Sequence, residues 1–218
     1  MKQNMVRINI GCGPKPTKGW KNFDNYLIVR LSKFPLLPTL LKRVGLIDKS
    51  QVAFFQFARK HSIEYGDATK GLPIPTGSVD VLYSSHMLEH LDQKEVALFL
   101  KEARRILRSG GIIRITVPDL RMQVQQYIES NDADAFILAT NLTQPRPRTI
   151  AQRLRILLVG TRHHQWMYDG MSLFRLLEDH GFIDSKILKA GESTIDNPQD
   201  LDLNERDSES VYIEAKNP

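Results

Sequence analysis

The chain has 218 residues, of which 41% are hydrophobic and 25% are charged, and its formal net charge is +5. This length allows one large α/β domain and is too short for two ordinary domains with independent cores. No apolar stretch is long enough to span a bilayer, and the single Cys12 excludes an internal disulfide and a cysteine-rich zinc site. We therefore expect one domain over residues 1–218, without a secretory signal and in the cytoplasm.

Charge is distributed unevenly along this chain. Residues 192–209 contain seven acidic side chains and a single basic one, Arg206. Basic side chains gather in residues 30–61, and residues 135–168 contain five arginines and no acid. Such patches favour an anionic partner, whether a phosphate, a nucleic acid or a membrane surface, although two solvated faces balanced by the acidic segment would explain them as well.

Four short strands are predicted in the first part of the chain, at residues 6–10, 20–24, 63–65 and 79–84. Between the first two, Pro14, Pro16 and Gly19 disfavour the crossover helix that usually joins neighbouring parallel strands. Between the second and third, residues 27–61 interrupt the pattern with leucines at helical spacing, followed by a cluster of phenylalanines. We interpret this basic, Leu- and Phe-rich segment as an insertion.

The clearest helix follows the fourth strand. Asp92 and Glu95 form a capping box, and an apolar stripe continues to Leu107, before Ser109-Gly110-Gly111 ends the helix. A further strand is predicted at residues 112–117, followed by a helix from about residue 120 to residue 128.

The last third of the chain has a weaker pattern. Residues 131–162 contain helical pieces around two prolines, and the local sequence does not decide their structure. Asp169 can cap a helix that ends before Gly181. Strands are predicted at residues 182–188 and 210–216, and since no helix lies between them we expect an antiparallel pair at a sheet edge.

Gly11-Cys12-Gly13, directly after the first strand, is interpreted together with Asp24 as a small-molecule cofactor site. Glycine lets the backbone adopt positive φ and approach a ligand closely, and a carboxylate at the end of the next strand can accept hydrogen bonds from ribose hydroxyls. An ordinary tight turn followed by a solvated aspartate is the alternative. A dinucleotide is disfavoured, because Pro16 stands where a third small residue and a helix N-terminus would face a pyrophosphate.

Polar residues also follow the other predicted strands. In an open parallel sheet, ligands bind beyond the carboxyl ends of the strands. Besides the glycines and Asp24, these ends carry Asp67, Ser84 to His86, and Pro118-Asp119.

These motifs resemble the class I S-adenosylmethionine-dependent methyltransferases, particularly the branch called the type 11 methyltransferase domain. The resemblance covers most of residues 5–120 and resumes at 163–216. It is carried by Ile8-Asn9-Ile10-Gly11-Cys12-Gly13, Gly19-Trp20-Lys21-Asn22-Phe23-Asp24, Gly66-Asp67-Ala68, Ser78-Val79-Asp80-Val81-Leu82-Tyr83-Ser84-Ser85-His86-Met87-Leu88-Glu89-His90, and Leu107-Arg108-Ser109-Gly110-Gly111. It implies a Rossmann-like α/β fold: a seven-stranded sheet, mostly parallel with an antiparallel edge strand, in three α/β/α layers.

The resemblance also implies the cofactor S-adenosylmethionine, the product S-adenosylhomocysteine and a set of contacts. Gly11, Cys12 and Gly13 form the loop under the methionine part, and Asp24 takes the ribose hydroxyls. Around the adenine and the sulfonium, the implied contacts are Asp67, Ala68, Ser84 and His86. The segment from Pro14 to Gly19 is shorter than the first helix of the family.

The implied reaction is direct methyl transfer, which proximity and alignment can largely drive. A base would help a hydroxyl or amine acceptor, and the candidate histidines are His86, His90, His163 and His164. We select His86 and His164 as catalytic residues and interpret His90 as an anchor for its loop. No metal is expected, because a metal site would need carboxylates that the sequence does not place there.

The acceptor is expected to contact the segments that the core fold lacks. These are the insertion at about 27–61 and a cap at about 131–165, which includes the arginine-rich residues 144–162. Basic charge beside Phe and Leu suits a lipid-linked or phosphorylated sugar acceptor, or docking at an anionic membrane surface. We therefore expect a small-molecule or glycan/lipid-linked acceptor. A lid or a dimer contact is the alternative for the insertion.

Two other functions remain open at this stage. One is a binding protein that keeps the cofactor fold without catalysis. The other is a nucleic-acid methyltransferase, which is disfavoured because Ser84-Ser85-His86-Met87 stands where base-amine enzymes carry an Asn/Asp-Pro-Pro-aromatic signature.

Overall fold

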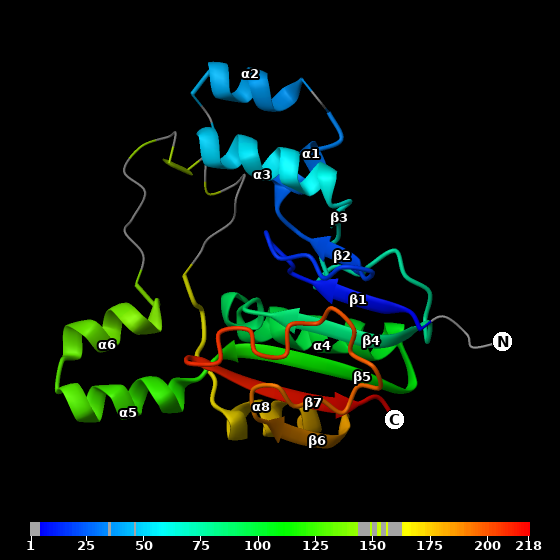
Figure 1. Ribbon diagram of the computed structural model, residues 1–218, viewed down its shortest axis with the longest axis vertical. Coiled ribbons are helices and arrows are strands. Elements are labelled where there is room, and N and C mark those ends of the chain that lie inside the picture. Colours follow the sequence, from blue (N-terminus) through cyan, green and yellow to red (C-terminus); the bar gives the residue numbers. More distant parts are fainter. Residues whose placement is uncertain are drawn as a thin grey trace.

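The computed structural model describes residues 5–34, 36–45, 47–143, 149, 152–153, 156 and 163–218. Its centre is a seven-stranded sheet in the order β3-β2-β1-β4-β5-β7-β6 (Figure 1). The strands are β1 (Arg7–Ile10), β2 (Lys21–Asp24), β3 (Glu64–Tyr65), β4 (Val79–Ser85), β5 (Leu107–Pro118), β6 (Ile183–Leu188) and β7 (Ser210–Lys216).

The strand directions match the sequence prediction. Strand β7 runs antiparallel to both β5 and β6, whereas the pairs β3–β2, β2–β1, β1–β4 and β4–β5 are parallel. The predicted antiparallel pair at the sheet edge is therefore confirmed, with β6 as the outermost strand. Residues 11–20 join β1 to β2 without a helix, as their prolines and glycine predict.

The helices α4 (Gln93–Ile106) and α8 (Gly170–Asp179) cover one face of the sheet. Successive strand residues point to opposite faces, and in β5 Ile113 and Ile115 join the buried cluster that contains the apolar sides of both helices. Both predicted helix starts are confirmed, because Asp92 and Asp169 each form a capping box. Helix α4 ends at Ile106, and β5 begins five residues earlier than its predicted strand because Leu107 already pairs with Val79.

The other face of β4, β5 and β7 is covered by the acidic loop 189–209. Ile195 and Leu201 of this loop pack with Trp20, Val81 and Tyr83 in a separate buried cluster. Over this part of the sheet, a loop therefore forms the layer in which the α/β/α expectation places helices. The loop passes in front of the strands in Figure 1.

Two helical projections extend from the carboxyl edge of the sheet (Figure 1). The predicted insertion forms α1 (Leu27–Leu31), α2 (Leu37–Arg43) and α3 (Lys49–Lys60), which we call the α1–α3 lobe. The second is the pair α5 (Leu120–Ser130) and α6 (Ala133–Thr140). The sequence did not decide the structure of residues 131–162, and the first part of this segment forms α6. Most of the arginine-rich residues 144–162 lie outside the described residues. Among the described helices, none is both long enough and apolar enough to cross a membrane.

Candidate functional site

The predicted site residues meet at the carboxyl edge of the parallel strands. Ile10 pairs with Phe23 on one side and with Ser84 on the other, and Asp24 pairs with Tyr65. Because these strands end in register, the segments that follow them lie side by side. The structure thus brings together the glycine loop, Asp24, Asp67 and His86, which the sequence alone could place only one by one.

The glycine loop is shaped around two residues with positive φ, Gly11 at 72° and Gly13 at 49°. A Cβ on Gly11 would lie 2.5 Å from Cγ of Met87, so only glycine fits between the loop and the segment after β4. Nothing lies within 4 Å of the equivalent position at Gly13. The loop therefore packs tightly at Gly11 and leaves open space above Gly13.

Asp24 is 3% exposed and is not the solvated residue of the alternative interpretation. Its Oδ2 accepts a hydrogen bond from the Gly13 N–H at 2.8 Å, and its Oδ1 accepts one from the Tyr26 N–H at 2.9 Å. Burial raises the pKa of this carboxyl above its ordinary value, although the two hydrogen bonds oppose that shift. Asp24 thereby ties the end of β2 to the glycine loop.

Asp67 lies in a turn that holds its charge. Its carboxylate accepts hydrogen bonds from the Thr69 N–H at 3.0 Å, the Thr69 hydroxyl at 2.7 Å and Lys70 Nζ at 2.8 Å. Burial alone would raise the pKa of Asp67, but the hydrogen bonds from Lys70 and Thr69 outweigh it and keep the pKa low. The neighbouring Ala68 is buried.

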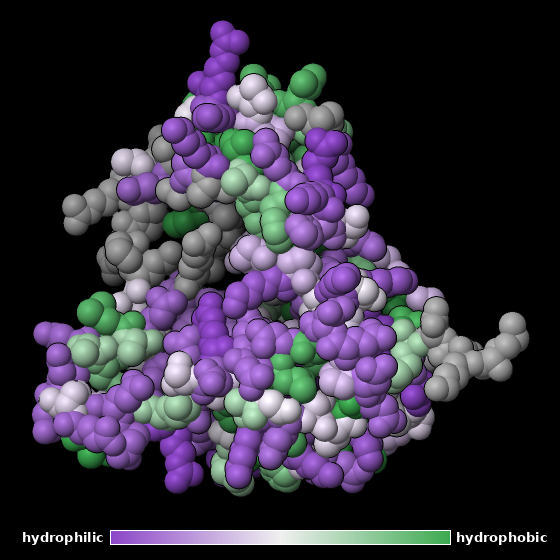
Figure 2. Space-filling model, in the orientation of Figure 1, coloured by the Kyte–Doolittle hydropathy of each residue, from purple (hydrophilic) through white to green (hydrophobic). Residues whose placement is uncertain are grey.

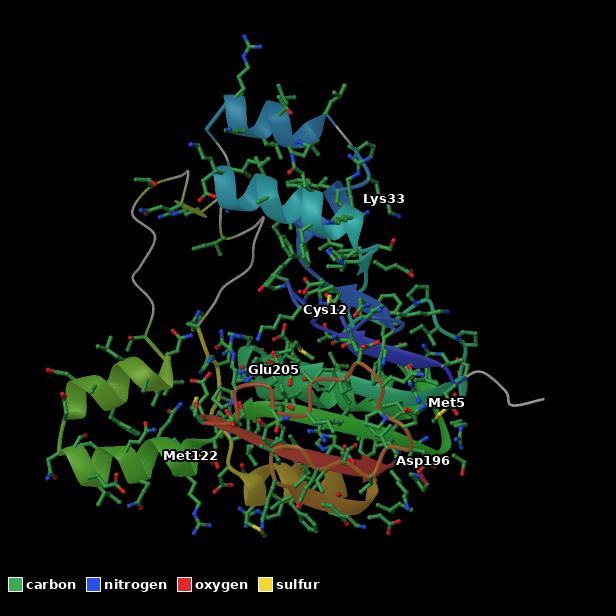
Figure 3. All side chains as sticks on the ribbon, viewed as in Figure 1. Met5, Cys12, Lys33, Met122, Asp196 and Glu205 are labelled. Atoms are coloured by element: carbon green, nitrogen blue, oxygen red, sulfur yellow. The ribbon has the colours of Figure 1, made fainter. Side chains whose placement is uncertain are left out.

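Cys12 is buried, and its side chain packs in the cluster of the α1–α3 lobe with Ile28 and Phe55. Figure 3 shows it between the sheet and that lobe. Burial raises the pKa of the thiol far above neutrality, so it stays protonated. Its side chain is thus part of the core, and any ligand contact of Cys12 would come from its backbone.

The end of β4 carries Ser84 and His86. Ser84 is 1% exposed, and its hydroxyl has no hydrogen-bond partner among the described residues. His86 adopts a positive φ of 48°, and its N–H donates to the Thr116 carbonyl at 2.8 Å. Its Nε2 lies 3.1 Å from the Ser210 hydroxyl, which fixes the ring at the edge of the sheet.

Two further side chains approach Nδ1 of His86, namely Glu89 Oε1 and Arg206 Nη1, each at 3.4 Å. Sequence reasoning missed Ser210 and Arg206, because the start of β7 and the acidic loop bring them from more than a hundred residues away. Glu89 follows His86 by three residues and belongs to the single turn η1 (Leu88–His90) that comes after it, so only its proximity in the sequence was a signal.

His164 lies beside this group but faces Glu89. It is 9% exposed, its Nδ1 is 2.8 Å from the Thr140 carbonyl, and its Nε2 is 3.9 Å from Glu89 Oε1. Burial lowers the pKa of His164, although the nearby Glu89 opposes this, so the ring is neutral at neutral pH. His90 is also held, with its Nδ1 3.0 Å from the His163 carbonyl, which supports its interpretation as a loop anchor.

A cavity of about 350 Å³ lies elsewhere, lined by Lys101, Arg104, Arg105, His180, Asn217 and Pro218. These residues surround the amino ends of the parallel strands, opposite the predicted site. Ligands of open α/β sheets bind at the carboxyl ends, so this cavity is not the candidate site.

The candidate site has features that fit a cofactor without a pyrophosphate. The loop approaches closely at Gly11, space is open at Gly13, and the hydroxyl of Ser84 is buried without a partner among the described residues. Buried hydroxyls normally have hydrogen-bond partners, so the Ser84 hydroxyl indicates a polar ligand or water at the end of β4.

Residues 36–115 match the family model described as "Methyltransferase domain". The matched range contains Asp67, Ser84 and His86, while the glycine loop and Asp24 precede it. A search of curated proteins finds no significant match in sequence.

Solved structures with a similar fold include two that are described as S-adenosylmethionine-dependent methyltransferases. One is the possible histamine N-methyltransferase of Thermotoga maritima, with a TM-score of 0.54 and 15% identity over 100% of this chain and 84% of that one. Another, from Archaeoglobus fulgidus, has a TM-score of 0.51 and 16% identity over 98% and 86%. PigF, solved with S-adenosylhomocysteine (SAH), has a TM-score of 0.50 and 15% identity over 98% of this chain and 56% of its own.

Proposed function

We propose that this chain is an S-adenosylmethionine-dependent methyltransferase, which the family match over residues 36–115 and the fold support, and that it methylates a small-molecule, glycan or lipid-linked acceptor by direct displacement. The observation that carries the proposal is the convergence of the glycine loop, Asp24, Asp67 and His86 at one edge of the sheet. S-adenosylmethionine supplies the methyl group from its sulfonium when bound there.

The residues on β1, β2 and β3 are proposed to hold the cofactor. Gly13 leaves space for the methionine part, and Ala68 lies where the adenine is expected. Asp24 has two oxygens whose remaining lone pairs can accept the ribose hydroxyls, since each is engaged by one backbone N–H. Asp67, charged and fixed by Thr69 and Lys70, is proposed to face the adenine amino group.

His86 is proposed as the group that receives the acceptor's proton. It directly follows β4, its ring is fixed by Ser210, and a base at this position need only reach the attacking hydroxyl or amine. His164 is the second candidate base. Its Nε2 lies 3.9 Å from Glu89 Oε1, and we place His86 first because it directly follows β4.

Calorimetry with S-adenosylmethionine and SAH tests the cofactor site. The unmodified protein is expected to bind both ligands. Asp24→Asn keeps the shape of the side chain but removes its charge and one of its two acceptor oxygens, and should weaken SAH binding by about 1.5–3 kcal/mol, or about 10- to 150-fold. The matched control is Asp132→Asn, because Asp132 is an exposed cap of α6 and Asn caps equally well.

Two results of this experiment would contradict the proposal. One is a folded protein that binds neither ligand, and the other is an Asp24→Asn variant with unchanged affinity. Binding without transfer of a labelled methyl group from S-adenosylmethionine to any component of a cell extract would favour the non-catalytic alternative. Partition of the label between lipid and aqueous extracts then separates lipid-linked from water-soluble acceptors.

The α1–α3 lobe supports an acceptor at a membrane surface. Helix α2 packs on α3, yet Leu36, Leu40 and Val44 stand on its outer side at a spacing of four residues and are 81%, 57% and 59% exposed. Lys42 and Arg43 are exposed next to them. Figure 2 shows apolar surface beside hydrophilic side chains at this tip of the molecule. An exposed apolar row flanked by basic charge suits an anionic lipid surface.

Sedimentation with vesicles tests this docking. The protein is expected to bind vesicles that contain phosphatidylglycerol and not vesicles of phosphatidylcholine alone. The double variant Leu36→Ser/Leu40→Ser should lose this binding, whereas Leu138→Ser, at a 74% exposed leucine of α6, should keep it. Equal vesicle binding by both variants would contradict docking through α2. So would an unmodified protein that is a dimer and a double variant that is a monomer.

A further inference from the structure

Glu89, His90 and His164 form a cluster that methyl transfer does not explain. Glu89 and His90 belong to the single turn η1 (Leu88–His90), which follows His86, and His164 comes from the segment before α8. One ligand atom from each of the three residues lies within 4.8 Å of the others. The backbone joins the two segments, because the N–H groups of Gln165 and Trp166 donate to the Glu89 carbonyl at 2.7 and 3.2 Å.

The two histidine rings are oriented by backbone carbonyls. Nδ1 of His90 lies 3.0 Å from the His163 carbonyl, and Nδ1 of His164 lies 2.8 Å from the Thr140 carbonyl. A carbonyl only accepts hydrogen bonds, so each Nδ1 carries a proton and Nε2 is the ring nitrogen that a metal ion would take. Metal-binding histidines are held in the same way, with the second nitrogen donating to a carbonyl or carboxylate.

The Nε2 atoms of His90 and His164 both face the carboxylate of Glu89. His90 Nε2 and His164 Nε2 each lie 3.9 Å from Glu89 Oε1, while His86 Nδ1 lies 3.4 Å from it. Glu89 is 1% exposed, and neither of its carboxylate oxygens has a hydrogen-bond partner among the described residues. A buried carboxylate without a partner is costly. Within the described part of the chain, two imidazole nitrogens and one carboxylate thus converge on one point, which is the geometry of a cation site.

The ligand types indicate which cation fits. Imidazole nitrogen suits zinc and the other later divalent transition metals, whereas Mg²⁺ and Ca²⁺ prefer all-oxygen sites. Two histidines and a glutamate are a familiar set for zinc sites that keep one position open. Metal–ligand bonds of about 2.1 Å in tetrahedral geometry separate ligand atoms by about 3.4 Å, so the 3.9 Å separations need to shrink by about half an ångström.

We propose that Glu89, His90 and His164 bind one divalent transition-metal ion of the zinc type and leave a coordination position open. A metal was not expected from the sequence because no carboxylate could be placed beside His164, and the fold supplies Glu89. Since Glu89 also contacts His86, the open position is suited to an oxygen of the methyl acceptor. That role rests on the proposed function, whereas metal binding itself does not.

Metal titration tests the proposal without a known acceptor. The full-length protein, stripped of metal with a chelator, is titrated with Zn²⁺ by calorimetry and with Co²⁺ by visible absorption. We expect the protein to bind one equivalent of either metal. The absorption spectrum of the bound Co²⁺ should be that of a low coordination number, and excess Mg²⁺ should not change it. Glu89→Gln and His164→Gln should weaken Zn²⁺ binding by about 100-fold or more, because each removes a ligand. The control is His61→Gln, at an exposed histidine of the lobe.

Several outcomes would overturn the proposal: no stoichiometric Zn²⁺ binding, equal affinity in Glu89→Gln and His61→Gln, or a site that Mg²⁺ fills in preference. If Glu89→Gln fails to fold, the unmodified protein alone tests metal binding. Its melting temperature should rise when Zn²⁺ is added and fall again when Zn²⁺ is removed. SAH calorimetry on the metal-free protein separates the two claims. If the protein binds SAH but not Zn²⁺, the proposed function stands and this inference is wrong. If it binds Zn²⁺ but not SAH, the metal site stands and the proposed function is wrong.

Discussion

The two halves of the carboxyl edge are assembled in different ways. On the β1–β3 side, Asp24 holds a loop eleven residues away and Asp67 is fixed by its own turn. On the β4–β5 side, His86 meets Ser210 and Arg206 across more than a hundred residues, and His164 is placed by α6 and η1. The β1–β3 side, proposed to hold the cofactor and called the cofactor half, is thus built from local contacts. The β4–β5 side, proposed to receive the acceptor and called the acceptor half, forms only when distant segments close over it.

The closure of the acceptor half depends on a buried ion pair. Arg114 of β5 and Glu214 of β7 are 0% and 1% exposed, and Arg114 Nη1 lies 2.6 Å from Glu214 Oε1. Glu214 also accepts hydrogen bonds from the Ser193 hydroxyl and the Thr194 N–H, while Arg114 donates to the Glu192 carbonyl. This pair therefore fastens the loop 189–209, which carries Arg206, to the sheet.

The largest expected effect is that of Glu214→Gln. We expect it to lower the free energy of unfolding by about 3–5 kcal/mol, because Arg114 would keep its charge in a buried site without a counter-ion. Denaturant unfolding at neutral pH measures this. The control is Asp184→Asn, which removes an exposed pair with Lys216 and should leave stability unchanged. Similar results for both variants would show that the loop is not fastened by this pair.

A smaller effect is expected in the cofactor half, where two glycines differ in their surroundings. Gly11→Ala should cost about 2–3 kcal/mol of unfolding free energy, since the new Cβ meets Met87 and the residue has a positive φ. Gly13→Ala should lower the unfolding free energy by only about 1 kcal/mol. Alanine is unfavourable at this positive φ, but nothing lies within 4 Å of its Cβ. Thermal or denaturant unfolding of the two variants gives the comparison, and equal losses would mean that Met87 yields to the added methyl group.

The same contrast explains what the sequence could predict. Capping residues and strand-end motifs are local, so α4, α8, Gly11 and Asp24 could be located before the fold was known. The short crossover between β1 and β2 followed from its prolines. Glu89 could not be recognised as a buried, unpartnered carboxylate, because its environment comes from segment 163–169. The helix expected over the second face of the sheet is replaced by an acidic loop whose sequence has no helical or strand period.

Glu205 connects the two halves, because this residue of the acidic loop, labelled in Figure 3, lies 3.1 Å from Lys15 Nζ in the segment after the glycine loop. It also accepts a hydrogen bond from the Tyr83 hydroxyl at 2.6 Å. Burial alone would raise the pKa of Glu205, but the bonds from Tyr83 and Lys15 outweigh it and hold the pKa below its ordinary value of 4.5.

A carboxyl whose pKa is lowered by folding stabilises the protein above its unfolded pKa, and that stability is lost as pH falls through the folded value. We therefore expect the difference in unfolding free energy between the unmodified protein and Glu205→Gln to shrink as pH falls from ~6 to ~3. Glu209→Gln, at an exposed carboxylate of the same loop, is the control and should show a smaller dependence on pH. A difference that stays constant with pH would mean that the charge of Glu205 contributes nothing, and that the two halves are joined by packing alone.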